Sequence, residues 1–293
     1  MGKKILPVTA IIGTYKTKDV AVKALVALYA GEALPQQVIV IDNNSQDGTI
    51  EFLRSQFPQV QYVQNEKDIG YAGSNNRAIR EFSTQPYLWL LSSDTETGSR
   101  SLEQLYQYLE DRPEVGAVGP QLVYPDHSLQ SVGGFFPTPL NTFFYLLPIT
   151  KLFPVSLRRR LKQIGLFPQL IPDTGLELDY VTGAAILLRK KALDQVGLMS
   201  EDFYMYFEDT DLCLRLRRAN WKCVVVNSDP VMHVYGGSFK TRYDNRRLKL
   251  TLDSMLLFIK KYYSGWKRVV MIVEVLALGP ISLLIKRLKN IFP

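Results

Sequence analysis

Short apolar runs recur along the first two-thirds of the chain, each bounded by turn-forming residues. Between the early runs, apolar residues lie three or four positions apart, the spacing of one helix face. This spacing predicts helices around Val20–Leu28, Ile50–Phe57 and Leu102–Leu109. The runs predict buried strands at Val8–Gly13, Val38–Ile41, Val60–Val63, Tyr87–Leu91, Val115–Val118, Val181–Leu188 and Cys223–Val226. Strands that alternate with helices predict an α/β doubly wound fold with a mostly parallel sheet covered on both faces.

Residues 124–175 interrupt this alternation. They hold several prolines, the basic run Arg158–Arg160 and an aromatic cluster of Phe135, Phe136, Phe143, Phe144 and Tyr145. Because so long a segment exceeds a plain connection, we expect a functional insert or lid. It belongs to a predicted catalytic domain over residues 1–240, which a basic helical tail over residues 241–293 follows.

The tail contains an apolar stretch, Val269–Ile285, whose only charged residue is Glu274 and which Gly279-Pro280 breaks. A spanning helix needs about 20 apolar residues, so this one is marginal. Lysines and arginines flank it on both sides, which favours a helix lying in, or dipping into, an anionic membrane surface. A helix that packs back on the body is the alternative.

Charge separates the tail from the body. The chain has 293 residues and a net charge of +7, yet from Lys240 onward there are 12 Lys and Arg against 3 Asp and Glu. The first 239 residues are therefore slightly acidic, which is not typical of a nucleic-acid-binding protein. Two cysteines exclude a disulfide scaffold and favour a reducing cytosol, and the first apolar run is short for a secretory signal. With two histidines in all, any metal must depend on carboxylates.

Polar residues follow the predicted strands, where an open parallel sheet binds its ligands. The first strand ends in Gly13-Thr14-Tyr15, and the second ends in Asp42. An acid in this position often hydrogen-bonds a ribose or base. The residues from Asp42 to Gly48 equally suit a turn and a helix cap, and the sequence leaves both interpretations open.

The loop that begins at Asn65 contains Gly70 and opens a helix, with Arg77 expected in the first turn. Backbone N–H groups at a helix start and an arginine together favour a diphosphate site. No G-x-G-x-x-G follows the first strand, which argues against a nicotinamide cofactor.

Acidic residues mark two further positions. Asp94 follows the fourth strand and is placed to hold a divalent cation against a diphosphate, with a cap as the alternative. Glu208, Asp209 and Asp211 precede a predicted helix at Leu212–Arg218, where they suit either capping or general-base catalysis. His233 follows a strand and precedes a glycine-rich stretch at 236–238, with Asp94 as its candidate partner.

Taken in order, these pieces resemble the family 2 glycosyltransferases, inverting enzymes of the GT-A fold, and in particular their bacterial rhamnosyltransferase-like branch. The matching pieces are Ile11–Tyr15, Val40–Thr49, Asn65 with Gly70–Asn76, Leu90–Thr95, Gly183-Ala184, Glu208–Asp211 and His233, and they cover about residues 8–240.

The resemblance implies a role for each matched position. Asp42 contacts the donor nucleoside beside Thr14 and Tyr15, and Asp94 matches the last acid of the D-x-D motif that binds a bridging Mg²⁺ or Mn²⁺. Asp209 matches the base that deprotonates the acceptor hydroxyl, and His233 adds a metal contact. The donor-binding set implied is Thr14, Tyr15, Asp42, Asn43, Gly70, Asn76, Arg77 and Asp94, with Glu208, Asp211 and Gly183 in support on the acceptor side.

The resemblance further implies a nucleoside-diphosphate sugar as donor, dTDP-rhamnose first and a UDP-sugar second. The acceptor it implies is a cell-surface glycan or a lipid-linked acceptor, and we expect the protein at the cytoplasmic face of the cell membrane, peripheral or shallowly inserted. One departure from the family is Ser92 in place of the first D-x-D acid, and no Q-x-x-R-W motif of processive synthases occurs. A nucleotidyltransferase of similar fold and a non-catalytic membrane-associated scaffold remain as alternatives.

Overall fold

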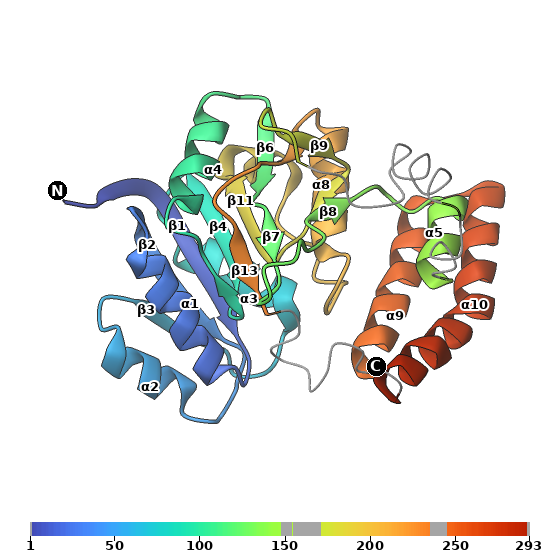
Figure 1. The fold of residues 1–293 in the computed structure, drawn as a ribbon, viewed down its shortest axis with the longest axis horizontal. Helices are drawn as coiled ribbons and strands as arrows, with labels where there is room; N and C mark the ends of the chain where they lie inside the picture. The colour runs from blue at the N-terminus through green and yellow to red at the C-terminus, as the bar shows by residue number, and fades with distance from the viewer. Residues whose placement is uncertain (1, 148–153, 155–170, 235–244, 292–293) are drawn as a thin grey trace.

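An eight-stranded sheet forms the centre of the protein. The computed structural model describes residues 2–147, 154, 171–234 and 245–291 (Figure 1). The strand order is β3-β2-β1-β4-β11-β6-β12-β9, in which β11 is antiparallel to both neighbours and β9 is antiparallel to β12. The strands are β1 (Lys4–Thr14), β2 (Ala33–Asp42), β3 (Gln61–Gln64), β4 (Tyr87–Ser92), β6 (Val115–Gly119), β9 (Leu176–Leu178), β11 (Ala185–Arg189) and β12 (Lys222–Val225). The remaining pairs are parallel, so the predicted mostly parallel sheet is confirmed.

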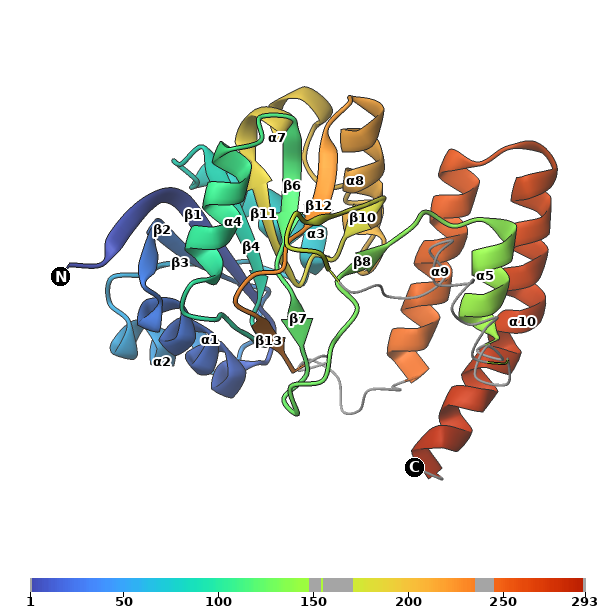
Figure 2. The same cartoon turned by 45° about the horizontal axis from the view of Figure 1, so that its top comes forward.

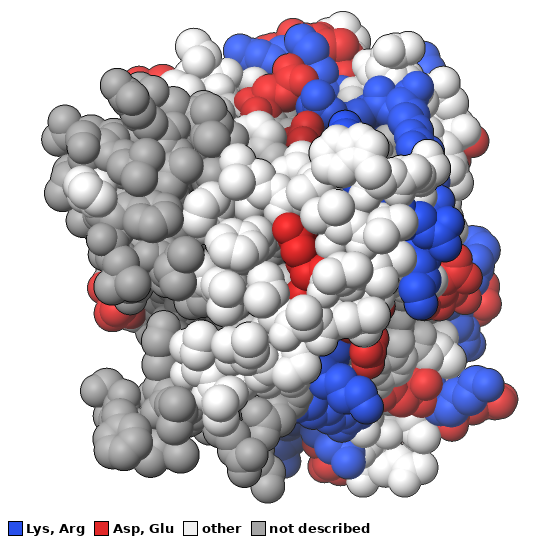
Figure 3. All heavy atoms as spheres, turned by 90° about the vertical axis from the view of Figure 1, so that its right-hand side faces the viewer, with Lys and Arg blue, Asp and Glu red and all other residues white. Residues whose placement is uncertain are grey.

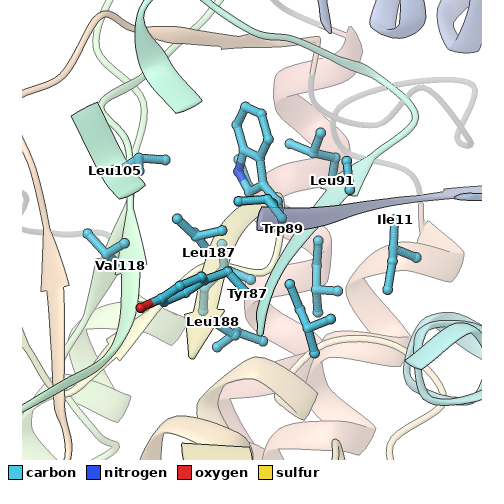
Figure 4. Close-up of a cluster of buried hydrophobic side chains, with 14 of the residues drawn as sticks. Ile11, Tyr87, Trp89, Leu91, Leu105, Val118, Leu187 and Leu188 are labelled. Carbon is cyan, nitrogen blue, oxygen red and sulfur yellow. The ribbon is translucent and has the colours of Figure 1, made fainter. Parts of the chain in front are cut away.

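Helices cover both faces of this sheet (Figures 1 and 2). They are α1 (Lys18–Ala30), α2 (Thr49–Gln56), α3 (Gly70–Glu81), α4 (Ser101–Glu110), α7 (Lys190–Val196) and α8 (Glu208–Arg218). The core lies around β1, β4 and β11, where Ile11, Trp89 and Leu187 are fully buried (Figure 4). Because β1 and β4 are buried, the positions of their ends are fixed, and so are the positions of the polar residues that follow them.

The run Val181–Leu188, predicted as one strand, is divided in two. Tyr180–Val181 forms β10, which pairs with β8 (Gly133–Gly134), whereas β11 begins only at Ala185. Residues 182 and 183 leave the sheet because their N–H groups bond elsewhere, whereas the Ala184 carbonyl still accepts from Ser92 N–H of β4 (2.9 Å). Thr182 N–H donates to Val132 (3.1 Å) and Gly183 N–H to the Asp209 carboxylate (2.8 Å). The interruption therefore places Gly183 against the start of α8.

A small second sheet brings distant segments together beyond β4. Its strands are β5 (Thr95–Glu96), β13 (Val231–His233) and β7 (Leu122–Val123). His233 pairs with Thr95 in this sheet, which sets its side chain beside Asp94.

Three helices form a separate unit beside the α/β body (Figure 2): α5 (Pro139–Leu146), α9 (Asn245–Tyr262) and α10 (Gly265–Ile291). A buried apolar cluster joins them, made of Leu146, Met255, Ile259, Met271 and Val275. The segment predicted as an insert thus contributes α5 to this unit, and its basic run Arg158–Arg160 lies outside the described residues. The division of the chain at residue 240 stays a prediction.

Helix α10 has two apolar faces. Met271 and Val275 are buried in the three-helix cluster, whereas Trp266, Val269, Val273, Leu276 and Leu284 on the opposite face are 57–67% exposed. The helix continues through Pro280, although the sequence suggested a break there. Just before it, Gly279 lets α9 approach closely, because a Cβ at that position would lie 3.1 Å from the Leu252 side chain of α9. Within the described residues, Gly265–Ile285 alone is long and apolar enough to cross a membrane by length and composition (mean hydropathy 2.1).

Candidate active site

A cavity of about 210 Å³ opens where β1 and β4 end, between the first turns of α3 and α8. Its described walls are Gly13, Thr14, Tyr15, Asn43, Asp68, Gly70, Tyr71, Ser74, Asn75, Ser92, Ser93, Asp94, Thr182, Gly183, Ala184, Tyr204, Met205, Tyr206, Glu208, Asp209, His233 and Arg247. The sequence motifs from both halves of the chain therefore meet in one place.

Asp94 and His233 form a pair on one wall. The His233 Nε2 atom lies 3.3 Å from Asp94 Oδ1, and both side chains are 11% exposed. Gln130 orients the imidazole, because its amide N–H donates to the His233 carbonyl (3.3 Å) and its oxygen lies 2.7 Å from Nδ1. The proton of a neutral ring is then on Nδ1, so the Nε2 lone pair points at a carboxylate. A cation held by both groups would remove that repulsion, and the Gln130 contact would orient the ring as second-shell bonds of metal-binding histidines commonly do.

Asp209, in the first turn of α8, is held by donors on both carboxylate oxygens. Gly183 N–H donates to Oδ2 (2.8 Å), while the Thr210 N–H (2.6 Å) and hydroxyl (3.1 Å) donate to Oδ1. Burial raises the pKa of Asp209 above its ordinary value, and these hydrogen bonds oppose part of that rise. The result is an oriented carboxylate at the cavity whose proton affinity exceeds that of an exposed aspartate, which suits a general base.

Gly183 is closely packed at this point. A Cβ there would lie 3.3 Å from the Tyr71 ring and 3.6 Å from Asp209 Cβ. The Tyr71 hydroxyl donates to the Gly183 carbonyl (2.5 Å), so a single peptide segment links α3 to the carboxylate of Asp209.

Glu208 lies beside Asp209 and is 6% exposed. Its Oε2 atom is buried and has no hydrogen-bond partner within the part of the chain that the structure describes. Burial, and then the charge of Asp209, hold the pKa of Glu208 well above its ordinary value. A protonated Glu208 presents a hydrogen-bond donor at the cavity.

Asp211, predicted to support the acceptor side, is fully buried and does not line the cavity. It forms ion pairs with Arg215 (2.9 Å) and Lys261 (3.3 Å) and accepts a hydrogen bond from Tyr262 (2.5 Å). Arg215 is in α8 and the other two partners are in α9, so Asp211 fixes the Asp209-bearing helix against α9.

The backbone just before α8 is strained. Tyr206 and Phe207 both have φ near +68°, a region that costs a side-chain-bearing residue about 1–2 kcal/mol. Phe207 packs on Phe258 of α9, with ring centres 5.4 Å apart, and Ser254 of α9 donates to the Met205 carbonyl (2.8 Å). Contacts with α9 thus hold the turn that aims Glu208 and Asp209.

Four of the residues predicted to bind the donor line the cavity: Thr14, Tyr15, Asn43 and Gly70. Asp42 does not line it: its carboxylate is 1% exposed and accepts hydrogen bonds from Thr14 (2.8 Å) and Ser45 N–H (2.8 Å). These bonds match the turn-and-cap interpretation left open by the sequence. A direct contact of Asp42 with a donor stays a prediction.

Asn76 and Arg77 are likewise absent from the described walls. The expectation that Arg77 lies in the first helical turn is wrong, because α3 begins at Gly70, two turns earlier. Arg77 bonds the Gln64 carbonyl (3.1 Å) and Asn65 Oδ1 (2.7 Å), and Asn76 bonds the Met199 backbone. The first amides of α3 are also engaged, with Gly70 N–H on Asp68 and Tyr71 N–H on the Tyr204 carbonyl.

Six wall residues lie outside both the predicted site and the matched motifs: Asp68, Thr182, Tyr204, Met205, Tyr206 and Arg247. Asp68 accepts hydrogen bonds from Asn43, Tyr204 and Gly70 N–H, and so joins three parts of the wall. Gly70 has φ near +73°, and a Cβ there would lie 2.4 Å from the Tyr204 carbonyl oxygen, so glycine is needed for this approach. The signal in the sequence that could have identified Asp68 was its position two residues before Gly70. Arg247 had none, because it begins a helix assigned to the tail.

Comparison with known proteins agrees with this geometry. A profile described as "Glycosyltransferase like family 2" matches residues 7–249. An N-acetylglucosaminyl-diphospho-decaprenol L-rhamnosyltransferase of Mycobacterium tuberculosis is 28% identical over 276 residues, 90% of this chain and 87% of that protein. The low-salt glycan biosynthesis hexosyltransferase Agl10 of Haloferax volcanii is 24% identical, over 90% of this chain and 84% of its own length. The fold resembles the mannosyltransferase PcManGT of Pyrobaculum calidifontis, solved with GDP-Man and Mn²⁺ (TM-score 0.58, 15% identity, 96% of this chain and 73% of that one).

Proposed function

The chain belongs to glycosyltransferase family 2, and on that premise we propose that it transfers a sugar from a nucleoside-diphosphate donor to a hydroxyl group with inversion. The resemblance, the GT-A fold and the enzyme class expected from the sequence are confirmed by the comparisons. The observation that carries the proposal is the single cavity that joins the Asp94–His233 pair to the oriented carboxylate of Asp209.

Asp209 acts as the base in this proposal. The acceptor hydroxyl gives its proton to the carboxylate while its oxygen bonds the anomeric carbon. The bond from that carbon to the diphosphate breaks, and the nucleoside diphosphate leaves with the electron pair. One base and one stabilised leaving group suffice for inversion. Glu208 holds the acceptor by a hydrogen bond from its protonated carboxyl group.

A divalent cation fits the Asp94–His233 pair. A carboxylate suits Mg²⁺ and Mn²⁺, and the imidazole nitrogen favours Mn²⁺ of the two. No cluster of three or more His, Cys, Asp or Glu side chains occurs among the described residues, so a cation held by Asp94 and His233 would need further ligands from the donor or from water. When bound, the cation neutralises charge on the leaving diphosphate.

The donor and acceptor follow the relatives. We propose dTDP-rhamnose as donor, with a UDP-sugar as the second candidate, because the Mycobacterium tuberculosis relative is named a rhamnosyltransferase. The same name includes a decaprenol diphosphate, so we propose a lipid-linked glycan as acceptor, met at the cytoplasmic face of the membrane.

Membrane attachment through α10 accords with that acceptor. The exposed apolar face of α10 carries Trp266 at one end, next to the exposed Lys267 and Arg268. Figure 3 shows this side of the molecule, mostly uncharged in the middle with basic side chains along its upper and right-hand margins. Because the opposite face of α10 packs on α5 and α9, we propose that the helix lies in the membrane surface rather than crossing it.

The test uses the full chain in detergent micelles with Mn²⁺ and a panel of dTDP-, UDP- and GDP-sugars. We expect one donor class to raise the melting temperature and to release its nucleoside diphosphate slowly by hydrolysis. Consumption of a nucleotide sugar only when inorganic pyrophosphate is added, with a nucleoside triphosphate and a sugar 1-phosphate as products, would instead indicate a nucleotidyltransferase. If no donor stabilises the protein or is consumed, the proposed function is wrong.

A further inference from the structure

Arg247 is the one lysine or arginine among the described residues that line the cavity. It is 6% exposed, and its guanidinium carbon lies 5.9 Å from the centre of the Tyr206 ring. Four carboxyl groups share the same walls: Asp68, Asp94, Glu208 and Asp209. Even with Glu208 protonated, the remaining carboxylates repel a diphosphate unless positive charge accompanies it.

From this arrangement we propose that Arg247 binds the diphosphate of the donor, an inference that rests on the proposed function above. A single divalent cation at Asp94 and His233 cannot offset both the wall carboxylates and an incoming diphosphate. A guanidinium group matches phosphate oxygens with two parallel N–H donors, and its charge persists at every working pH. Since negative charge on the diphosphate grows as the sugar leaves, Arg247 stabilises the transition state more than the bound donor.

Helix α9 fixes Arg247 for this task. Ser254 bonds the Met205 carbonyl, and Tyr262 and Lys261 bond Asp211 of α8, so α9 is tied to the α/β body along its length. The same helix packs on α10 through Met255 and Ile259. Residues assigned from sequence to a membrane tail therefore complete the wall of the site.

The test replaces Arg247 by Met and by Lys, with Arg246→Met as the matched control. Arg246 is the adjacent arginine, is exposed and does not line the cavity. Each protein is titrated by calorimetry with the nucleoside diphosphate that the parent binds, in the presence of Mn²⁺, and with the free nucleoside. We expect R247M to lose 10-fold to 100-fold in diphosphate affinity and none for the nucleoside, and R247K to fall between. In turnover, kcat should fall as well as kcat/KM.

The outcomes separate this inference from the proposed function. If the parent binds no nucleoside diphosphate, the proposed function fails first. If the parent binds and R247M binds equally well, Arg247 does not contact the donor diphosphate. If R247M loses affinity only for a prenyl diphosphate, the assignment to the donor is also wrong. Should R247M not fold, R247K decides alone, because an unchanged diphosphate affinity and unchanged kcat in that variant contradict the proposal.

Discussion

Replacing Asp209 by Asn removes the proposed base while keeping its shape. The parent carboxylate accepts hydrogen bonds on both oxygens, from Gly183 N–H on one side and from Thr210 on the other. An amide has a single acceptor oxygen, so one of these donors will face an NH₂ group. Leaving a buried donor unsatisfied costs about 1–3 kcal/mol.

A second effect opposes this loss of stability. The raised pKa of Asp209 shows that its charged form is disfavoured by burial, and the variant carries no charge at that position. We therefore expect D209N to fold, with a free energy of unfolding within about 2 kcal/mol of the parent. The loss of general-base catalysis is worth roughly 10²–10⁴ in rate, which is about 3–5 kcal/mol of activation free energy. The predicted loss of activity is thus larger than the predicted change in stability.

The assay measures transfer rate against pH together with the melting temperature. Asp194→Asn serves as the matched control, because Asp194 is on the exposed side of α7, where it forms an ion pair with Lys190 (3.2 Å). Since the base must be deprotonated, the parent rate should fall on acidification at a higher pH than an exposed aspartate would give. D209N should lack this acid limb. A variant that keeps turnover within a few-fold of the parent refutes the assignment, and Glu208 would be tested next, because Asp211 is buried among its cations.

Three further predictions follow from the same geometry. Asp94→Ala should remove most of the Mn²⁺ dependence of nucleoside-diphosphate binding without unfolding the chain, and calorimetry showing equal metal dependence in parent and variant would contradict the metal site. Glu208→Gln should be more stable than the parent at pH 8 and equal to it near pH 4. A carboxyl group with a raised folded-state pKa stabilises the folded protein at low pH, and this contribution is lost as the pH increases through the folded pKa. A melting-temperature difference between variant and parent that does not change with pH would contradict this prediction. Polar substitutions at Val269, Val273 and Leu276 should release the protein from vesicles containing anionic lipid and leave donor binding intact. Met271→Ser, on the buried face, should instead lower the melting temperature. If the variant with the polar substitutions still sediments with the vesicles, the exposed face of α10 is not the site of attachment.

The α/β architecture could be predicted because its determinants are local. Val8–Gly13 and Tyr87–Leu91 are continuous apolar runs whose burial fixes the ends of β1 and β4, and Thr14 and Asp94 follow directly. The positions of His233 beside Asp94 and of Gly183 beside Asp209 depended on the ordered match to a family. In the structure, strand pairing and one backbone hydrogen bond establish those contacts.

Other features are decided by tertiary packing and had no local signal. The interruption at residues 182–184 looks apolar in sequence, yet bonds to Val132 and Asp209 draw it out of the sheet. Asn76 and Arg77 have polar side chains near a glycine-rich turn, but the start of α3 at Gly70 directs them to Met199 and Asn65. Arg247 is separated from the other site residues in sequence, and only the packing of α9 on the body brings it to the cavity.

The proposed attachment through the exposed face of α10 would change how often enzyme and acceptor meet. A protein held at a bilayer by one helical face meets a lipid-linked acceptor by lateral diffusion in two dimensions, with its cavity at a set height and tilt. The quantity that governs saturation is then the mole fraction of acceptor in the lipid, and diluting the vesicles at constant composition leaves the rate per bound enzyme unchanged. The soluble donor still reaches the cavity from bulk solution. The rate therefore depends on the donor concentration in solution but on the mole fraction of the acceptor in the lipid.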